Sequence, residues 1–145
     1  MSAPRIDLTA VAEAYPAMAK FDAAAREGVD PALGELVRIR ASQINGCAFC
    51  LDMHTRAARD AGERRPRLDA LAAWRESPLF TEAERAALAL TESMTLVAGE
   101  GVPEEVLAAA RAHFDEAGLA GLVWAIAAIN TWNRVAVAAG LRPPG

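Results

Sequence analysis

The stretch DPALGELVRIRASQINGCAFCLDMHTRAARDAG, residues 30–62, decides the fold class of this chain. Asp30 is a residue type that caps helix N-termini well, and Pro31 after it suits the first helical position. The middle of the segment, LVRIR (36–40), also alternates in the manner of a half-buried strand. We therefore predict a helix that begins at Pro31, with a strand as the alternative for its middle.

Asn45-Gly46 interrupts this pattern. Between two strands the same dipeptide would be a strong hairpin signal. Here the segment that follows, CLDMHTRAARDAG (50–62), has the pattern of a helix and ends in glycine, as helices commonly do. We predict two helices separated by a break at Asn45-Gly46.

Most other segments of the chain also have helical features. Apolar residues recur at helical spacing over residues 9–26, where Pro16 is a candidate kink. TEAE (81–84) is a capping box that marks a helix start. Short connections between seven predicted helices indicate an all-α bundle in a single domain, residues 1–145. The remaining predicted helices span 66–74, 81–97, 103–113 and 116–139.

Composition and charge narrow the class of partner. Apolar residues make up 53% of the chain, and the excess is largely alanine, which favours close helix packing and leaves room for a buried subunit interface. The formal net charge is −4, so the chain has no overall basic surface for nucleic acid. We interpret the local arginine cluster GERRPR (62–67) as a solvated loop and expect no nucleic-acid partner.

No segment predicts secretion or a membrane anchor. The N-terminus lacks the continuous apolar run of a signal peptide. The longest apolar run, 117–129, falls short of the ~20 residues that span a bilayer, so we interpret it as a buried helix. Two cysteines three positions apart cannot form the disulfide framework of a secreted domain. The expected location is cytoplasmic, where such a pair is metal-binding or catalytic.

The two cysteines leave several kinds of site open. A zinc site would use Cys47, Cys50, His54 and His113, a minimal ligand set without a second paired motif. A c-type haem site needs histidine directly after the second cysteine, where this chain has Leu51. An iron–sulfur cluster needs more cysteine or histidine ligands than the motif supplies. Two inert cysteines buried in the core are the remaining structural alternative.

Helix geometry favours a redox pair over these alternatives. At about 100° per residue, Cys50 and His54 lie about 300° and 340° from Cys47, so the three side chains share one helix face. Cys50 and His54 are one turn apart, close enough for a direct or water-bridged hydrogen bond. Cys47 follows the predicted break, where free N–H groups and the helix dipole favour a thiolate. C-x-x-C spacing at a helix start also lowers thiol pKa values.

The longer segment GELVRIRASQINGCAFCLDMH (34–54) resembles the alkylhydroperoxidase AhpD-like core of the carboxymuconolactone decarboxylase family. The family pattern places a glutamate twelve positions before a C-x-x-C pair and a histidine four positions after the pair. Segments 74–92 and 129–140 are similar to that family too, so the resemblance covers roughly residues 30–140. The residues that keep every spacing of the pattern are Glu35, Cys47, Cys50 and His54.

The resemblance implies an AhpD-like helical bundle that assembles into trimers or hexamers. It also implies a peroxidase or disulfide reductase that acts on alkyl hydroperoxides without a cofactor. Cys50 would attack the peroxide as a thiolate, and Cys47 would resolve the sulfenic acid into a disulfide. His54 and Glu35 would move protons, with water between them. The implied electron donor is a protein dithiol, either lipoylated or linked to a peroxiredoxin.

Phe49 departs from the family pattern. The best-known members have a histidine at this place before the second cysteine. Its replacement removes a proton donor and makes the site more apolar, which favours weak peroxidase turnover or a protein disulfide as the substrate. The decarboxylase branch lacks the cysteine pair, so decarboxylation is disfavoured. A non-catalytic redox sensor or partner-binding oligomer is the alternative from another functional class.

Polar residues outside the motif are expected to have structural roles. Asn130 and Asn133 need hydrogen-bond partners if they are buried. Ser42 and Asn45 are interpreted as capping or turning the chain, and His113 as structural or solvated. The apolar residues of the last predicted helix are expected in the core or at an interface, with a pocket wall as the alternative: Trp124, Ile126, Ile129 and Trp132.

Overall fold

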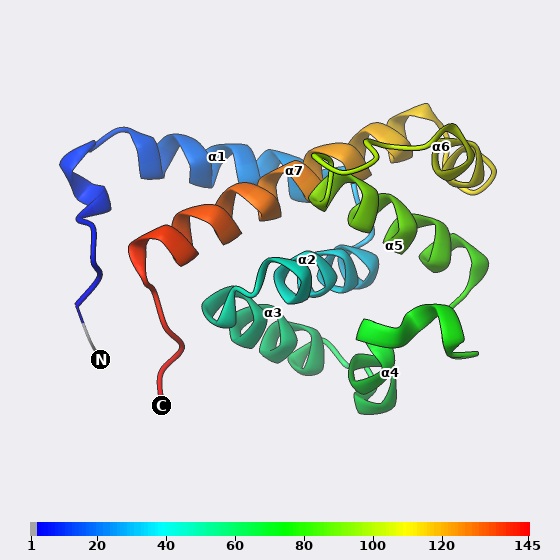
Figure 1. Cartoon of the computed structure of the whole chain (residues 1–145), viewed down its shortest axis with the longest axis horizontal. Helices are drawn as coiled ribbons and strands as arrows, with labels where there is room; N and C mark the ends of the chain where they lie inside the picture. Colours follow the sequence, from blue (N-terminus) through cyan, green and yellow to red (C-terminus); the bar gives the residue numbers. More distant parts are fainter. Residues whose placement is uncertain (1–2) are drawn as a thin grey trace.

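A computed structural model describes residues 3–145, in which helices are the regular secondary structure and no strand is present (Figure 1). The prediction of an all-α bundle is confirmed. Two short 3-10 helices, η1 and η2, accompany the α-helices. The elements in chain order are η1 Leu8–Ala10, α1 Ala14–Glu27, α2 Pro31–Asn45, α3 Ala48–Asp60, α4 Arg65–Ala70, η2 Leu71–Glu76, α5 Glu82–Thr95, α6 Glu104–Arg111 and α7 Glu116–Ala139.

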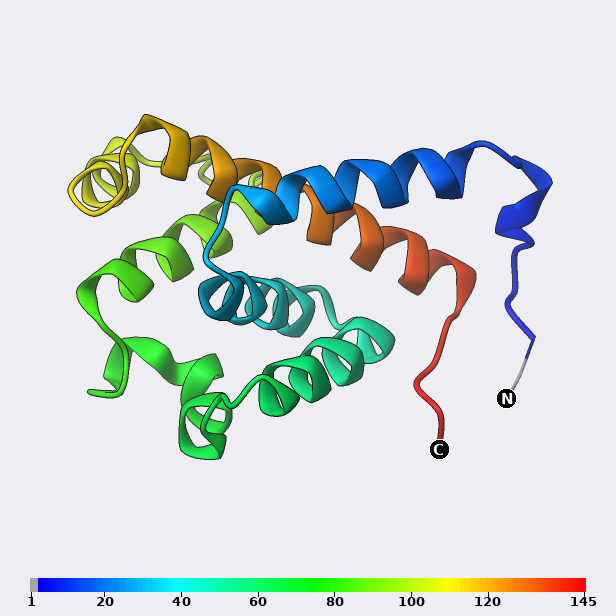
Figure 2. The same ribbon diagram turned by 180° about the vertical axis from the view of Figure 1, so that it is seen from behind.

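Helix α2 is the central element of the bundle. It packs against α3, α5 and α7, and both views show these neighbours around it (Figures 1 and 2). Four consecutive residues, 36–39, are buried because partners surround the helix on several sides. The whole segment LVRIR lies within α2, so the strand alternative for this segment is wrong. Asp30 caps the helix as predicted, accepting a hydrogen bond from the Leu33 N–H at 3.1 Å.

Two predicted helices differ from the observed ones. The helix expected over 9–26 begins only at Ala14, after the separate turn η1. Pro16 therefore lies in the first turn, where its missing N–H has no intrahelical partner to lose, and it causes no kink. The helix expected over 66–74 is divided into α4 and η2, with Ala73 at non-helical backbone angles inside η2. The predicted bounds of both helices are corrected accordingly.

Helix α7 spans Glu116–Ala139, as predicted, and contacts α1, α2, α3, α5 and α6. Within residues 3–145 it is the only helix long and apolar enough to span a membrane by length and composition. Its contacts in the bundle account for that apolar character. Gly121 allows α1 to approach closely, because a Cβ at this position would lie 2.2 Å from the carbonyl oxygen of Gly28.

A largely buried carboxylate, Glu92, joins three elements of the bundle. It accepts hydrogen bonds from Arg40 of α2 at 3.0 Å and from the Trp74 indole of η2 at 2.8 Å, and it also pairs with Arg75. Burial by itself would raise the pKa of Glu92. The hydrogen bonds from Arg75, Trp74 and Arg40 outweigh burial and hold the pKa below the ordinary glutamate value of 4.5.

Glu92→Gln is expected to lower stability by about 1.5–3 kcal/mol at neutral pH, since it removes a charged hydrogen-bond acceptor. The folded pKa lies below the unfolded one, so this stabilisation is present above about pH 4.5 and is lost as the pH falls through the folded pKa. Urea unfolding at pH 7 and at about pH 3 measures the difference between variant and wild type. Glu105→Gln, at an exposed position, is the control, and an equal deficit at both pH values would contradict the assignment.

Candidate active site

The junction between α2 and α3 places the cysteines. Gly46 adopts a left-handed conformation (φ +65°) that ends α2, which confirms the break predicted at Asn45-Gly46. Cys47 is the N-cap of α3, and its Sγ accepts a hydrogen bond from the Cys50 N–H at 3.3 Å. The second cysteine lies in the first turn of α3. Both thiols are free and buried, each side chain being 2% exposed.

Glu35 of α2 and His54 of α3 form a hydrogen-bonded pair. His54 Nδ1 lies 2.9 Å from Glu35 Oε2, and both side chains are largely buried. Because the carboxylate can only accept, Nδ1 carries the proton in this bond and Nε2 is left to accept one. The spacing pattern therefore corresponds to a direct contact between two residues that are nineteen positions apart in the sequence.

The charge of Glu35 is maintained by its neighbours. Burial would raise the pKa of this carboxyl, but the hydrogen bond and charge of His54, together with Arg38 and Arg26, lower it below its usual value. Arg38 lies 3.4 Å and Arg26 lies 3.5 Å from Glu35 Oε1. Glu35 is therefore ionised at neutral pH and is positioned to stabilise a protonated His54.

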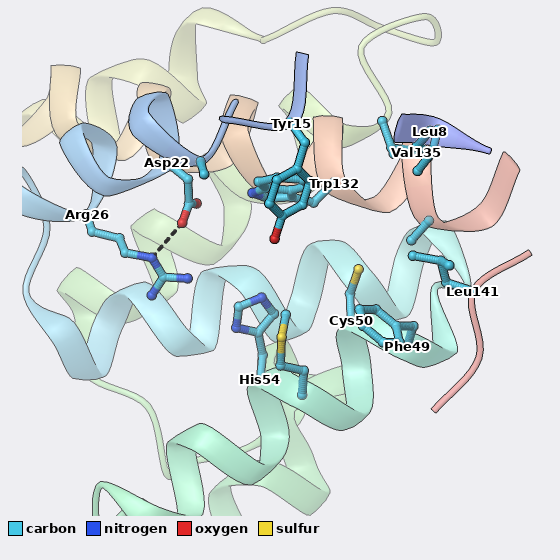
Figure 3. A pocket seen from close by; sticks show the side chains of 13 residues that line it. Leu8, Tyr15, Asp22, Arg26, Phe49, Cys50, His54, Trp132, Val135 and Leu141 are labelled. Carbon is cyan, nitrogen blue, oxygen red and sulfur yellow. Dashed lines mark hydrogen bonds and ion pairs between the residues drawn. The ribbon is translucent and has the colours of Figure 1, made fainter. Parts of the chain in front are cut away.

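A pocket of about 480 Å³ opens in front of Cys50 and His54, between α1, α3, α7 and the C-terminal segment (Figure 3). The Cys50 sulfur points into this pocket, whereas Cys47 and Glu35 are not among its lining residues. At one end Asp22 and Arg26 of α1 form an ion pair at 2.8 Å. The remaining walls are mainly apolar and include Tyr15, Phe49, Met53, Trp132 and Leu141.

The surroundings of the Cys50 thiol favour its protonated form. Burial raises its pKa to about 12, and the hydrogen bond with Cys47 adds to the rise. The lowering of the thiol pKa expected from C-x-x-C spacing at a helix start is not found for Cys50, because burial is the larger effect there. Any reaction of Cys50 as a thiolate needs a base at the pocket.

The pocket shows where the aromatic and apolar residues predicted for the last helix lie, and it adds one residue that was not predicted. Trp132 is a pocket wall and packs against the Tyr15 ring, with centroids 5.6 Å apart, so the alternative interpretation holds for Trp132. Trp124 is largely exposed and contacts Phe21 instead, while Ile126 and Ile129 are buried in the core as expected. Tyr15 was not predicted, because its place over the pocket depends on the packing of α1 against α7.

A metal-binding arrangement has no support in the part of the chain that the structure describes. Residues 3–145 contain no group of three or more His, Cys, Asp and Glu side chains arranged to hold an ion. His113, the fourth zinc ligand considered, is exposed in the connection between α6 and α7, away from the cysteines on α3.

Comparison with known proteins identifies the family. The sequence profile of the carboxymuconolactone decarboxylase family matches residues 9–93, more than half of the chain. The chain belongs to the carboxymuconolactone decarboxylase family. The resemblance to this family stated for residues 34–54 is thereby confirmed.

Relatives within the carboxymuconolactone decarboxylase family support this placement. The chain is 47% identical over 108 residues to the uncharacterized protein YdfG of Bacillus subtilis, and this match covers 74% of each protein. It is 45% identical over 47 residues to the alkyl hydroperoxide reductase AhpD of a Bradyrhizobium species, a match that covers 32% of this chain and 26% of that protein. About a third of the chain is thus similar to a protein named as an alkyl hydroperoxide reductase.

The fold of this family member has a solved counterpart along its whole length. The crystal structure of ATU0492 from Agrobacterium tumefaciens, described as a protein of unknown function and a candidate antioxidant defence protein AhpD, superposes with a TM-score of 0.93. The two sequences are 37% identical, and the match covers 98% of this chain and 99% of the other. The chain therefore has the AhpD-like all-α fold.

Proposed function

We propose that this protein is a thiol-dependent peroxidase or dithiol–disulfide oxidoreductase that acts on organic hydroperoxides through Cys50 and Cys47. The observation that carries the proposal is the arrangement of one thiol and one histidine at the same pocket. Cys50 and His54 both line it, and the 2.9 Å bond between His54 and Glu35 backs the histidine with a carboxylate. Similarity to an alkyl hydroperoxide reductase supports the same chemistry.

The high pKa of Cys50 assigns a first task to His54. Neutral His54 accepts the thiol proton, directly or through water, and Glu35 stabilises the resulting imidazolium. The thiolate then attacks the terminal peroxide oxygen, so that an S–O bond forms while the O–O bond breaks. The departing alkoxide takes the proton from His54 and leaves as an alcohol, and Cys50 becomes a sulfenic acid.

Cys47 completes the cycle in this proposal. Its sulfur attacks the sulfur of the Cys50 sulfenic acid, the S–O bond breaks, and water leaves as the disulfide forms. A protein dithiol, lipoylated or linked to a peroxiredoxin, then reduces the disulfide by thiol–disulfide exchange. The proposal assigns the first attack to Cys50 on grounds of access, because Cys50 lines the pocket and Cys47 is not among the residues that line it.

The pocket walls favour an uncharged organic substrate. The aromatic rings of Tyr15, Phe49 and Trp132 face the space in front of Cys50. The one arginine on the wall, Arg26, is already paired with Asp22, so it does not offer a free charge to an anionic substrate. Phe49, which departs from the family pattern, contributes to this apolar wall rather than to proton transfer.

Glu35→Gln is expected to reduce the rate of hydroperoxide consumption by about 10–100-fold, since glutamine preserves the shape of the pair but not its negative charge. Initial rates with tert-butyl hydroperoxide and dithiothreitol, measured across the pH range, test this prediction. Glu105→Gln, which changes an exposed glutamate of α6, is the matched control and is expected to behave as wild type. Equal rates for both variants and wild type would exclude the proposed proton relay.

A redox sensor is the second candidate function. It is favoured by the burial of both thiols, which slows turnover, and by exposed apolar side chains that a partner or a second copy would cover, such as Leu96, Val97 and Trp124. A sensor would consume about one equivalent of peroxide and change its elution on gel filtration. Repeated turnover with an unchanged elution volume would instead support the peroxidase. A trimer or hexamer is the assembly that we propose for the protein in either case.

A further inference from the structure

A chain of hydrogen-bonded amides connects α2 and α7. Asn133 of α7 is fully buried, and its Oδ1 accepts a hydrogen bond from Asn45 Nδ2 at 2.9 Å. Its Nδ2 donates to the Ser42 hydroxyl at 3.0 Å. Asn45 also donates to Asn130 Oδ1 at 3.0 Å. Burying this many polar groups in an apolar bundle is costly unless each is satisfied, so the network defines one arrangement.

The orientation of the Asn133 amide is fixed from both ends of this chain. The Ser42 hydroxyl donates to the Arg38 carbonyl at 2.7 Å, so its oxygen accepts from Asn133. At the other end, Asn130 Nδ2 donates to the Ile126 carbonyl at 2.9 Å, which directs its oxygen toward Asn45. Asn45 must then present its NH₂ group, and Asn133 must meet it with oxygen. One N–H of Asn133 remains free of these bonds.

Asn133 lies on the face of α7 that packs against the cysteines. Ile129, Asn133 and Ala136 share one face of α7, spaced four and three positions apart. Ile129 and Ala136 pack in the same core cluster as Cys47 and Cys50. Burial raises the pKa of Cys50, and the Asn133 amide acts against that rise. Asn133 is thus a buried amide on the face of α7 that packs beside the two cysteines.

We propose that Asn133 donates its remaining N–H to the Cys50 sulfur and stabilises the thiolate at the moment of reaction. The inference rests on the proposed function, in which Cys50 reacts as a thiolate. It adds a residue that neither composition nor the spacing pattern indicates. The network of Ser42, Asn45 and Asn130 holds the amide in place before the thiol loses its proton, so no reorganisation accompanies ionisation.

The ionisable groups around Cys50 come from elements other than α7. Cys47 and His54 lie on α3, Glu35 lies behind His54 on α2, and Tyr15, Asp22 and Arg26 line the pocket from α1. Arg26 is paired with Asp22, so the cation on the wall is already compensated. Asn133 supplies a hydrogen bond from the protein interior without burying a further charge.

The test measures Cys50 alone, in a Cys47→Ser background that leaves one thiol in the chain. The rate of alkylation by iodoacetamide across pH gives the apparent pKa of that thiol. Asn133→Leu is expected to lower the rate at pH 8 by at least about tenfold, equivalent to one pKa unit or ~1.4 kcal/mol. Asn133→Asp, which keeps the side-chain shape but places a carboxylate near the sulfur, is expected to lower the rate further.

Thr131→Val is the matched control, because Thr131 is an exposed residue of the same helix and its hydroxyl donates to the Ala127 carbonyl of that helix rather than to the amide network. It is expected to alkylate within about twofold of the parent. Melting curves accompany each variant, and Asn133→Asp carries the test if the leucine variant does not fold. Unchanged alkylation in both Asn133 variants would overturn the inference. If the Asn133 variants show the expected fall in alkylation rate but the wild-type protein does not turn over hydroperoxide, the result counts against the proposed function instead.

Discussion

Cys50→Ser is expected to abolish hydroperoxide consumption, with a loss of at least ~10³-fold in kcat/KM, because a serine hydroxyl cannot replace the thiolate as nucleophile. The expectation follows from access, since the Cys50 sulfur faces the 480 Å³ pocket beside His54. Cys47→Ser is expected to behave differently. It retains the attacking thiol, so one equivalent of peroxide is reduced and the enzyme stops at the sulfenic acid.

Trapping the intermediate separates the two cysteines. Protein treated with one equivalent of tert-butyl hydroperoxide and then with dimedone is digested and analysed by mass spectrometry. The Cys47→Ser variant is expected to carry the dimedone adduct on Cys50, and the Cys50→Ser variant is expected to carry none on Cys47. Wild type is expected to show the disulfide. A Cys50→Ser variant that consumes peroxide at the wild-type rate would exclude Cys50 as the attacking residue.

Gly121→Ala is expected to be the most destabilising single-methyl change in the bundle. The added Cβ would lie 2.2 Å from the Gly28 carbonyl oxygen, a backbone atom that cannot move aside without separating α1 from α7. We expect a loss of about 3 kcal/mol, the upper part of the usual range for overpacking. For a chain of this length the loss corresponds to a fall of about 10 °C in Tm.

Two other glycines provide a graded control for this prediction. A Cβ at Gly28 would lie 2.9 Å from the Cα of Gly121, and a Cβ at Gly99 would lie 3.4 Å from the nearest atom outside its chain neighbours. The Tm of Gly99→Ala is therefore expected near that of wild type, with Gly28→Ala between the two. Calorimetry of the three variants tests the order. Equal melting temperatures for Gly121→Ala and Gly99→Ala would refute the close approach of α1 and α7.

Helix ends were predictable where their signals are local. Three such signals act within a few residues of their own position: Asp30 followed by proline, the capping box at Thr81 and Glu84, and the glycine of Asn45-Gly46. The start of α1 at Ala14 was not predictable from local sequence. Its apolar spacing continues upstream of Ala14, but those residues are exposed and form only the short turn η1.

The site was predictable only in part for a related reason. Helical periodicity places Cys50 and His54 on one face of α3, but no local pattern brings Glu35 to His54, and that pair was expected from family resemblance alone. The rise in the pKa of Cys50 was not predictable, because the burial of this thiol is a property of the assembled bundle. The same holds for Tyr15 and Asn133, whose places depend on how α1 and α7 pack.

The cap of α3 has a consequence for redox equilibrium. At most capped helix N-termini the side-chain acceptor is an oxygen atom that takes no part in redox chemistry. The acceptor at the start of α3 is the sulfur of Cys47, which accepts a hydrogen bond from the Cys50 N–H. The atom that holds the helix start is also the atom that must close the disulfide. Whatever strength that hydrogen bond loses on oxidation is a free-energy difference between the two redox states, and it favours the dithiol. The first turn of α3 therefore shifts the reduction potential of the cysteine pair in the direction that makes the disulfide easier to reduce.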